Sequence, residues 1–302
     1  MKYLSIICLA LFVLFACKNE PAPDTMNGLE KLYKDYEVEP NAARAEIYLD
    51  SLMQFIPTVM ENKQEALPYL QQGVAVSMAQ GLLSSAPGFL LPLLRNYPNL
   101  ENRKQHLLQL GDVMFAIRKR HASNIVYEKL TTDYPNDAAI SKKKKLIEEE
   151  ALIQEDYVTY LFDQLTINAD KTGINKSAAL KYVDAVEAFA LVAPNDESVP
   201  RHLYGAAEVA RSLRTFPKAM SLYDWILENY PTSEKAPNVL FIKGFILEQD
   251  YNRDEEARSV YEEFLAKYPT HQMAESAQFL LNNLGKTDEE ILREIEKKRK
   301  KS

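Results

Sequence analysis

Residue types that carry chemistry are scarce in this sequence. Its 302 residues include two cysteines, four histidines, one tryptophan and nine glycines. The histidines, at 106, 121, 202 and 271, share no metal-ligand spacing. The chain also lacks a phosphate-binding glycine loop, a His-Glu-x-x-His pair and two cysteines at zinc spacing. We therefore expect no enzyme, no metal and no cofactor.

An excess of basic residues is also missing. The chain has 36 Lys and Arg against 43 Asp and Glu, for a net charge of −7. Because a surface that binds phosphates normally leaves a basic excess, we expect no nucleic-acid partner. The composition is 46% hydrophobic and 26% charged, which is typical of a globular protein. A chain of this length buries a sizeable core without disulfides or metal.

The longest apolar run lies at the N-terminus. Residues 4–16 read LSIICLALFVLFA, which is too short to cross a bilayer and is typical of a secretion signal. Residues 14–17 resemble a bacterial lipobox, in which the cysteine becomes the lipidated N-terminus. We expect a signal peptide at 1–16 that is removed together with Cys8, and lipidation of Cys17. The alternative is an ordinary cleaved signal peptide or an uncleaved anchor.

Residues 17–28 predict a lipidated flexible tether. They are rich in Pro, Asn and acidic residues and poor in apolar ones. Several acyl chains on Cys17 would anchor the protein stably to a membrane that it does not span. Lys18 is not the aspartate that commonly retains lipoproteins at the inner membrane. By that resemblance we expect a bacterial outer-membrane location, lipid-anchored on the periplasmic face.

A short tag that ends in proline recurs along the chain. Tyr-Pro occurs at 97–98, 134–135, 230–231 and 268–269, and Ala193-Pro194 is a degenerate copy. The intervals between the prolines are 37, 59, 37 and 38 residues. These intervals are close to the length of helical-hairpin repeats, with one longer insertion.

The residues upstream of each proline have helical periodicity. Positions 12, 9, 8, 5, 4 and 1 residues before the proline lie on one face of a helix. Before Pro269 and Pro231 every one of these positions holds a residue that packs: Ala257, Val260, Tyr261, Phe264, Leu265 and Tyr268, and Ala219, Leu222, Tyr223, Ile226, Leu227 and Tyr230. We interpret each copy as the second helix of a hairpin, which the proline ends by disfavouring helical geometry in the preceding residue. With no sustained β alternation, the fold is predicted to be all-α.

The first helix of a hairpin is clearest at residues 233–250. Gly244 lies 25 residues before Pro269 and allows a neighbouring helix to approach closely. Ala206 is the small equivalent before Pro231. Short turns at 214–217 and 250–254 are predicted to join the paired helices.

Residues 136–170 are expected to form one long helix instead. A Ser-x-x-Lys match at 141–144 lies within it, but it opens the run KKKKLIEEE. We interpret this run as a solvated helix face on which Lys144 and Glu148 are one turn apart.

The spacing of a small residue, an aromatic residue and a terminal proline resembles the tetratricopeptide repeat family. It occurs in Ala219, Tyr223 and Pro231 and again in Ala257, Tyr261 and Pro269. The resemblance is good over residues 195–285 and looser over 86–135. It implies an α-solenoid of tetratricopeptide-like helical hairpins. The C-terminal part is also similar to BamD-like and Tol-associated periplasmic repeat proteins, which implies a role in the cell envelope.

These observations predict the domain organisation and the function. After the signal peptide and tether, we expect irregular helical repeats at 29–170 and tetratricopeptide repeats with a capping helix at 171–302. The predicted function is a membrane-anchored scaffold that binds protein partners of the bacterial envelope, with no small-molecule ligand evident. The alternative is a solute-binding or uptake accessory lipoprotein that uses the helical groove for a ligand. An enzyme with a carboxylate pair brought together by folding is a third hypothesis.

Two further features suggest specific roles. Trp225 lies six residues before its proline, where the copies that end at Pro135 and Pro269 hold the charged Lys129 and Glu263. An aromatic residue on an otherwise polar face is a candidate partner anchor, whereas packing on a neighbouring helix is the alternative. Near the C-terminus, Thr287 and Glu290 have the spacing of a capping box, which predicts a terminal helix that closes the stack.

Overall fold

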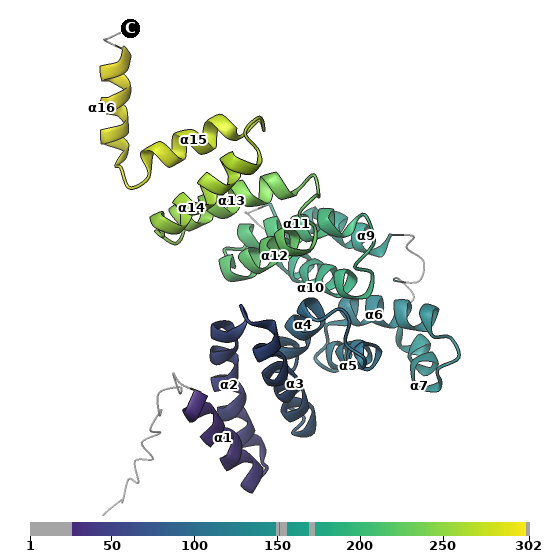
Figure 1. Cartoon of the computed structure of the whole chain (residues 1–302). Coiled ribbons are helices and arrows are strands. Elements are labelled where there is room, and N and C mark those ends of the chain that lie inside the picture. Colours follow the sequence, from purple (N-terminus) through teal and green to yellow (C-terminus); the bar gives the residue numbers. More distant parts are fainter. Residues whose placement is uncertain (1–25, 149–150, 152–155, 169–172, 300–302) are drawn as a thin grey trace, which may run out of the picture. The chain divides into compact units, whose positions relative to one another are not determined.

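Helices make up all of the regular secondary structure in the described part of the chain (Figure 1). The structure is a computed structural model that describes residues 26–148, 151, 156–168 and 173–299. The predicted all-α fold is therefore confirmed. The signal peptide, Cys17 and most of the tether lie outside the described residues. Within these residues, no helix has both the length and the apolar character that a membrane span requires.

The chain divides into two compact units, residues 1–89 and 90–302. The sequence-based boundary between residues 170 and 171 lies in 169–172, outside the described residues. That division of the repeats stays a prediction.

The first unit contains three helices and the start of a fourth. They are α1 (Met26–Val38), α2 (Ala42–Val59), α3 (Lys63–Ala79) and the first residues of α4 (Pro87–Asn96). α2 packs against both α1 and α3. Asn41 begins α2, because its side chain accepts a hydrogen bond from the Arg44 N–H at 3.0 Å. Tyr48 and Leu52 of α2 are fully buried between the two neighbouring helices.

The second unit is built of helical hairpins that follow one another along the chain. Its elements are the rest of α4, α5 (Arg103–Ala116), α6 (Arg120–Asp133), α7 (Ala138–Ser141), η1 (Lys142–Leu146), α9 (Tyr157–Asp163), η2 (Gln164–Thr166), α10 (Lys176–Val192), α11 (Val199–Ser212), α12 (Phe216–Asn229), α13 (Ala236–Gln249), α14 (Asp254–Lys267), α15 (Ala274–Asn283) and α16 (Asp288–Arg299). α5 pairs with α6, α11 with α12 and α13 with α14, while α10 packs against both α6 and α11.

Proline ends the second helix of each hairpin in the same way. The residues before the prolines have nearly identical non-helical dihedral angles: φ −130° and ψ 57° at Tyr134, −131° and 52° at Ala193, −133° and 49° at Tyr230, and −131° and 53° at Tyr268. Each residue still donates its N–H to the carbonyl four residues earlier. The predicted helix ends are confirmed.

The connection to the next hairpin is also repeated. The Ser233 N–H donates to the Tyr230 carbonyl at 3.0 Å, and the Ala236 N–H donates to the Ser233 carbonyl at 2.9 Å. His271 and Ala274 make the same two bonds, at 3.1 and 2.8 Å, after Tyr268. Two consecutive turns of fixed geometry therefore set the direction of each following helix.

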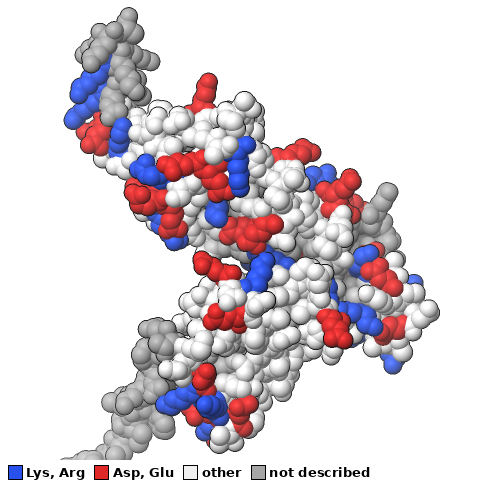
Figure 2. All heavy atoms as spheres, in the orientation of Figure 1, with Lys and Arg blue, Asp and Glu red and all other residues white. Residues whose placement is uncertain are grey.

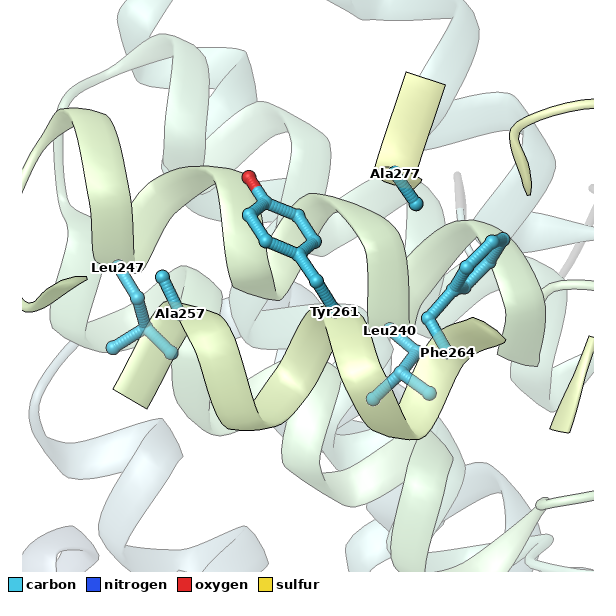
Figure 3. Close-up of a cluster of buried hydrophobic side chains, with 6 residues drawn as sticks. All are labelled: Leu240, Leu247, Ala257, Tyr261, Phe264 and Ala277. Carbon is cyan, nitrogen blue, oxygen red and sulfur yellow. The ribbon is translucent and has the colours of Figure 1, made fainter. Parts of the chain in front are cut away.

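The predicted apolar face of these second helices is confirmed. Ala257, Tyr261 and Phe264 of α14 are fully buried and pack with α13 and α15 (Figure 3). Among the five copies, Tyr134 is the exposed exception, with 40% of its surface accessible. The ammonium of Lys104 lies 5.2 Å from the centroid of that ring.

A tyrosine eight residues before the proline joins the two helices of a hairpin. The hydroxyl of Tyr127 donates to Asp112 at 2.7 Å, and that of Tyr261 donates to Glu248 at 2.8 Å. Tyr223 makes the same bond to Glu208. In each case burial, followed by the carboxylate that accepts the hydrogen bond, raises the pKa of the phenol well above its usual value. These tyrosines stay protonated donors.

Two of these tyrosines, Tyr127 and Tyr261, lie against a glycine on the first helix. A Cβ added at Gly244 would be 2.7 Å from Cε1 of Tyr261, and one added at Gly111 would be 2.7 Å from Cε1 of Tyr127. Such distances are too short for a carbon contact, so the absence of a side chain allows the ring to pack there. The predicted role of Gly244 is confirmed.

The prediction of one long helix over 136–170 is wrong. α7 ends at Ser141, η1 is a 3₁₀ turn, and Ile147 is extended, with φ −73° and ψ 130°. The buried Asn124 of α6 explains this break. Its side chain accepts from the Glu148 N–H at 3.4 Å and donates to the Glu148 carboxylate at 3.1 Å. Glu148 is thereby bound to α6 rather than held one turn from Lys144 on a helix face.

α16 begins with the predicted capping box. The Thr287 N–H donates to the Glu290 carboxylate at 2.9 Å, and the Glu290 N–H donates to the Thr287 hydroxyl at 3.3 Å. Leu292 of this helix is 60% exposed. The role of α16 in closing the stack stays a prediction.

We expect Gly244→Ala to lower the free energy of unfolding by about 1–2 kcal/mol, because overpacking against Tyr261 outweighs the better helix propensity of alanine. Urea denaturation measures this change. In a Tyr261→Leu background, which removes the ring, the same substitution should cost much less. An equal cost in both backgrounds would contradict the ring contact as its cause.

Candidate functional site

A groove of about 370 Å³ lies on the second unit where α12, α13 and α14 meet. Its apolar lining consists of Leu227, Leu240 and Val260, one from each helix. Pro231 and Tyr268, from the ends of the two second helices, also line it. We call this surface the α12–α14 groove.

The repeat pattern explains why apolar side chains remain accessible here. Leu227 lies four residues before Pro231, and Val260 lies nine residues before Pro269, so both belong to the predicted apolar faces. They are only half-buried, whereas Tyr223 and Tyr261, near the centres of these faces, are fully buried. The apolar stripe of each second helix is therefore wider than the part of it that packing within the hairpin buries. Its edge forms the groove.

Ion pairs surround the apolar lining. Lys243 Nζ lies 2.7 Å from Asp224 Oδ1, between α13 and α12. Lys267 Nζ lies 2.6 Å from Glu263 Oε1, and this hydrogen bond raises the pKa of the lysine. Acidic and basic side chains lie close together over α13 and α14 in Figure 2. The rim therefore presents both signs of charge.

An apolar centre with a charged rim is the arrangement found in protein interfaces. Exposed ion pairs such as Lys267–Glu263 contribute only about 0–1 kcal/mol to stability. Their charges therefore exchange partners at little cost when a binding partner supplies its own. The groove is suited to a segment with apolar side chains and flanking charges.

Trp225 is buried beside this groove. Only 5% of its surface is accessible, so the alternative of packing against a neighbouring helix describes its environment. The guanidinium of Arg95, from α4, lies over the indole at 5.3 Å from the ring centroid. An anchoring role for Trp225 would require displacement of Arg95 and stays a prediction.

Several bonds hold Arg95 in this position. It donates to the Ser221 carbonyl at 2.9 Å and to the Glu228 carboxylate at 3.1 Å. Because both acceptors belong to α12, Arg95 joins elements that are more than 120 residues apart in sequence. Arg95 therefore covers the face of α12 on which Trp225 lies.

A second cavity, of about 410 Å³, lies between α6, α9 and α10. Asp156 and Asp196 line it, but both carboxylates are used in local turns. Asp156 accepts from the Thr159 N–H at 2.9 Å, and Asp196 accepts from the Ser198 N–H at 2.8 Å. Burial raises the pKa of a third lining acid, Glu128. Two of the three acidic residues that line this cavity are thus bound within the chain, and the solute-binding alternative stays a prediction.

The four histidines lie on different helices or turns of the second unit. His106 and His202 are buried in α5 and α11, and burial lowers the pKa of His202. His106 Nδ1 lies 2.9 Å from Gln109 Oε1. In the described ranges, no group of three or more His, Cys, Asp or Glu side chains is arranged to hold a metal ion.

One family model matches the groove region. It is described as tetratricopeptide repeat and covers residues 239–271. The match covers one repeat unit rather than the whole chain. This repeat contains α14 and most of α13, and it supplies six of the residues that line the α12–α14 groove: Leu240, Lys243, Val260, Glu263, Lys267 and Tyr268.

Among solved structures, the chain is similar to the TPR2AB domain of yeast Sti1 in its complex with pHSP90. The identity is 15% and the TM-score is 0.31. The alignment covers 84% of this chain and 94% of that chain. No curated protein matches the chain.

The sequence predicts Leu227 and Val260 as residues of apolar packing faces, but it predicts neither the groove nor its rim. Leu227 and Val260 were identifiable from their distance to proline. The Lys243–Asp224 pair joins helices of different hairpins, and no spacing rule within one helix reveals it. Of the two site residues suggested by the sequence, Trp225 lies beside the groove without lining it. Cys17 lies outside the described residues.

We expect the fluorescence of Trp225, the single tryptophan, to be blue-shifted and weakly quenched by acrylamide. Arg95→Ala should shift the emission to the red, increase quenching and destabilise the protein by about 1 kcal/mol, because the cation–π cover and an ion pair are lost. Arg293→Ala, which removes a 71% exposed arginine, is the matched control. Strong quenching of the unaltered protein would contradict the burial of Trp225.

Proposed function

We propose that this chain is a membrane-anchored scaffold of the bacterial cell envelope and that the α12–α14 groove binds a protein partner. The observation that carries the proposal is the apolar groove with a charged rim, six of whose ten lining residues lie in the stretch that matches a tetratricopeptide repeat. Repeat proteins present extended surfaces of this kind to partner segments. Their function then needs no chemistry of its own.

The envelope location is supported by the sequence at the N-terminus. The apolar run at 4–16 and the lipobox-like residues that end at Cys17 are typical of a lipoprotein. Residues 17–25 would then tether the helical units to an acylated cysteine. Acylation keeps the scaffold at a membrane surface, which raises its effective concentration near envelope partners.

Photo-crosslinking in living cells tests this proposal. A benzophenone amino acid replaces Val260, which lies in the groove, or Glu262, which is exposed on the same helix and does not line it. We expect the Val260 position to give one stoichiometric adduct with an envelope protein, and the Glu262 position to give much less. Mass spectrometry then identifies the partner.

A second arm of the experiment separates binding from anchoring. Intact-mass analysis should show acyl chains on Cys17, and Cys17→Ser should lose them and leave the membrane fraction. If the Cys17→Ser protein still forms the Val260 adduct in detergent extracts, the groove binds independently of the anchor. Equal adducts from Val260 and Glu262 would contradict the groove as the binding site.

A further inference from the structure

A separate cavity of about 480 Å³ lies in the first unit, between α1, α2 and α3. Three tyrosines, two glutamates and a glutamine supply most of its lining: Tyr33, Tyr48, Tyr69, Glu30, Glu65 and Gln72. We call it the tyrosine pocket. It is far larger than a single side chain requires and lies within the usual range of ligand sites, about 300–1,000 Å³.

Helical spacing places these residues together. Glu30 and Tyr33 are three residues apart on α1, and Glu65 and Tyr69 are four residues apart on α3. Each pair therefore shares one face of its helix. Tyr48, from the intervening α2, is fully buried and forms the base of the pocket.

Ring contacts hold the tyrosines in place. Tyr33 packs on Tyr48 with 5.1 Å between ring centroids, and Tyr69 packs edge-on against Phe55 at 5.0 Å. The hydroxyl of Tyr48 donates to the Gln72 side chain. Tyr33 and Tyr69 are only half-buried, so part of each ring remains open to the pocket. These aromatic surfaces are preorganised.

The lining of the pocket is negatively charged over the residues that the structure describes. None of its lining residues is Lys or Arg. Glu30 makes no hydrogen bond or ion pair within the described residues, and Glu65 accepts a single hydrogen bond of 3.3 Å from Asn62. Burial, followed by the charges of Glu30 and Glu65, raises the pKa of Tyr69.

We propose that the tyrosine pocket binds an arginine side chain of a protein partner. A guanidinium stacks on aromatic faces and pairs with carboxylates, so the combination of Tyr33 and Tyr69 with Glu30 and Glu65 matches both of its preferences. The volume that remains beyond one guanidinium accommodates neighbouring residues of the same segment. This proposal rests on the protein-binding function proposed above and gives one recognition element of the partner.

Fluorescence anisotropy with a defined probe tests the tyrosine pocket. The full-length lipidated protein in detergent is titrated with the labelled peptide Gly-Ser-Gly-Arg-Gly-Arg-Gly-Ser. The reference peptide carries citrulline, which keeps the shape of arginine but is neutral, in place of both arginines. We expect the arginine peptide to bind about tenfold more tightly, as aromatic and carboxylate contacts to one cation predict.

Variants then locate the binding site. Glu30→Gln and Tyr69→Leu should each lower the affinity for the arginine peptide about 3- to 10-fold. Tyr69→Phe keeps the ring and should retain most of the affinity. Glu46→Gln is the matched control, because Glu46 is an exposed acid of α2 that does not line the pocket. Circular dichroism checks that each variant is folded.

Three results would overturn the proposal. The first is equal affinity for the arginine and citrulline peptides. The second is an equal loss of affinity from Glu30→Gln and Glu46→Gln. The third is displacement of the peptide by tetramethylammonium chloride at the same concentration, which would indicate a site for small cations. The groove experiment at Val260 is independent, because it probes the second unit. A groove adduct without arginine selectivity would refute the pocket proposal and leave the scaffold intact.

Discussion

The contact on which the second unit most depends is a buried tyrosine that joins the two helices of a hairpin. In the α13–α14 hairpin, Tyr261 packs on the bare backbone of Gly244 and donates a hydrogen bond to Glu248. The ring needs a residue without a side chain beneath it, and its hydroxyl needs an acceptor once it leaves water. Both needs are met by the first helix. Because Tyr127 repeats the whole arrangement and Tyr223 repeats the bond to a carboxylate, each hairpin has a fixed internal geometry.

Fixed hairpins explain where the second unit has an accessible apolar surface. The centre of each apolar stripe is used inside the hairpin, and proline ends each second helix at the same dihedral angles. The edges of the stripes on α12 and α14 remain uncovered, so Leu227 and Val260 meet Leu240 in a groove. Ion pairs that contribute little to stability surround it. This accessible surface has an apolar centre and a charged rim, which is why we propose it as the site that binds a protein partner.

The repeats were predictable from the sequence because their signals are local. The distance of Tyr261 from Pro269 and the position of Gly244 identify the packing without knowledge of the fold. The break after residue 146 was not predictable, because the buried Asn124 causes it by binding Glu148 from 24 residues away. Arg95 covers Trp225, and the tyrosine pocket combines residues of three helices, whose packing against one another the spacing within each helix does not reveal. Contacts between segments that are far apart in the sequence are therefore not predictable from local sequence patterns.

The most direct measurement of the central contact is a double-mutant cycle on Tyr261 and Glu248. Free energies of unfolding would be measured in urea for Tyr261→Phe, for Glu248→Leu, which removes the acceptor, and for the double variant. If the buried hydroxyl depends on the carboxylate, the two substitutions should be coupled by about 1 kcal/mol, so that the double variant loses less stability than the sum of the single ones. Additive effects within about 0.3 kcal/mol would show that the hydrogen bond does not hold the hairpin and would contradict this account.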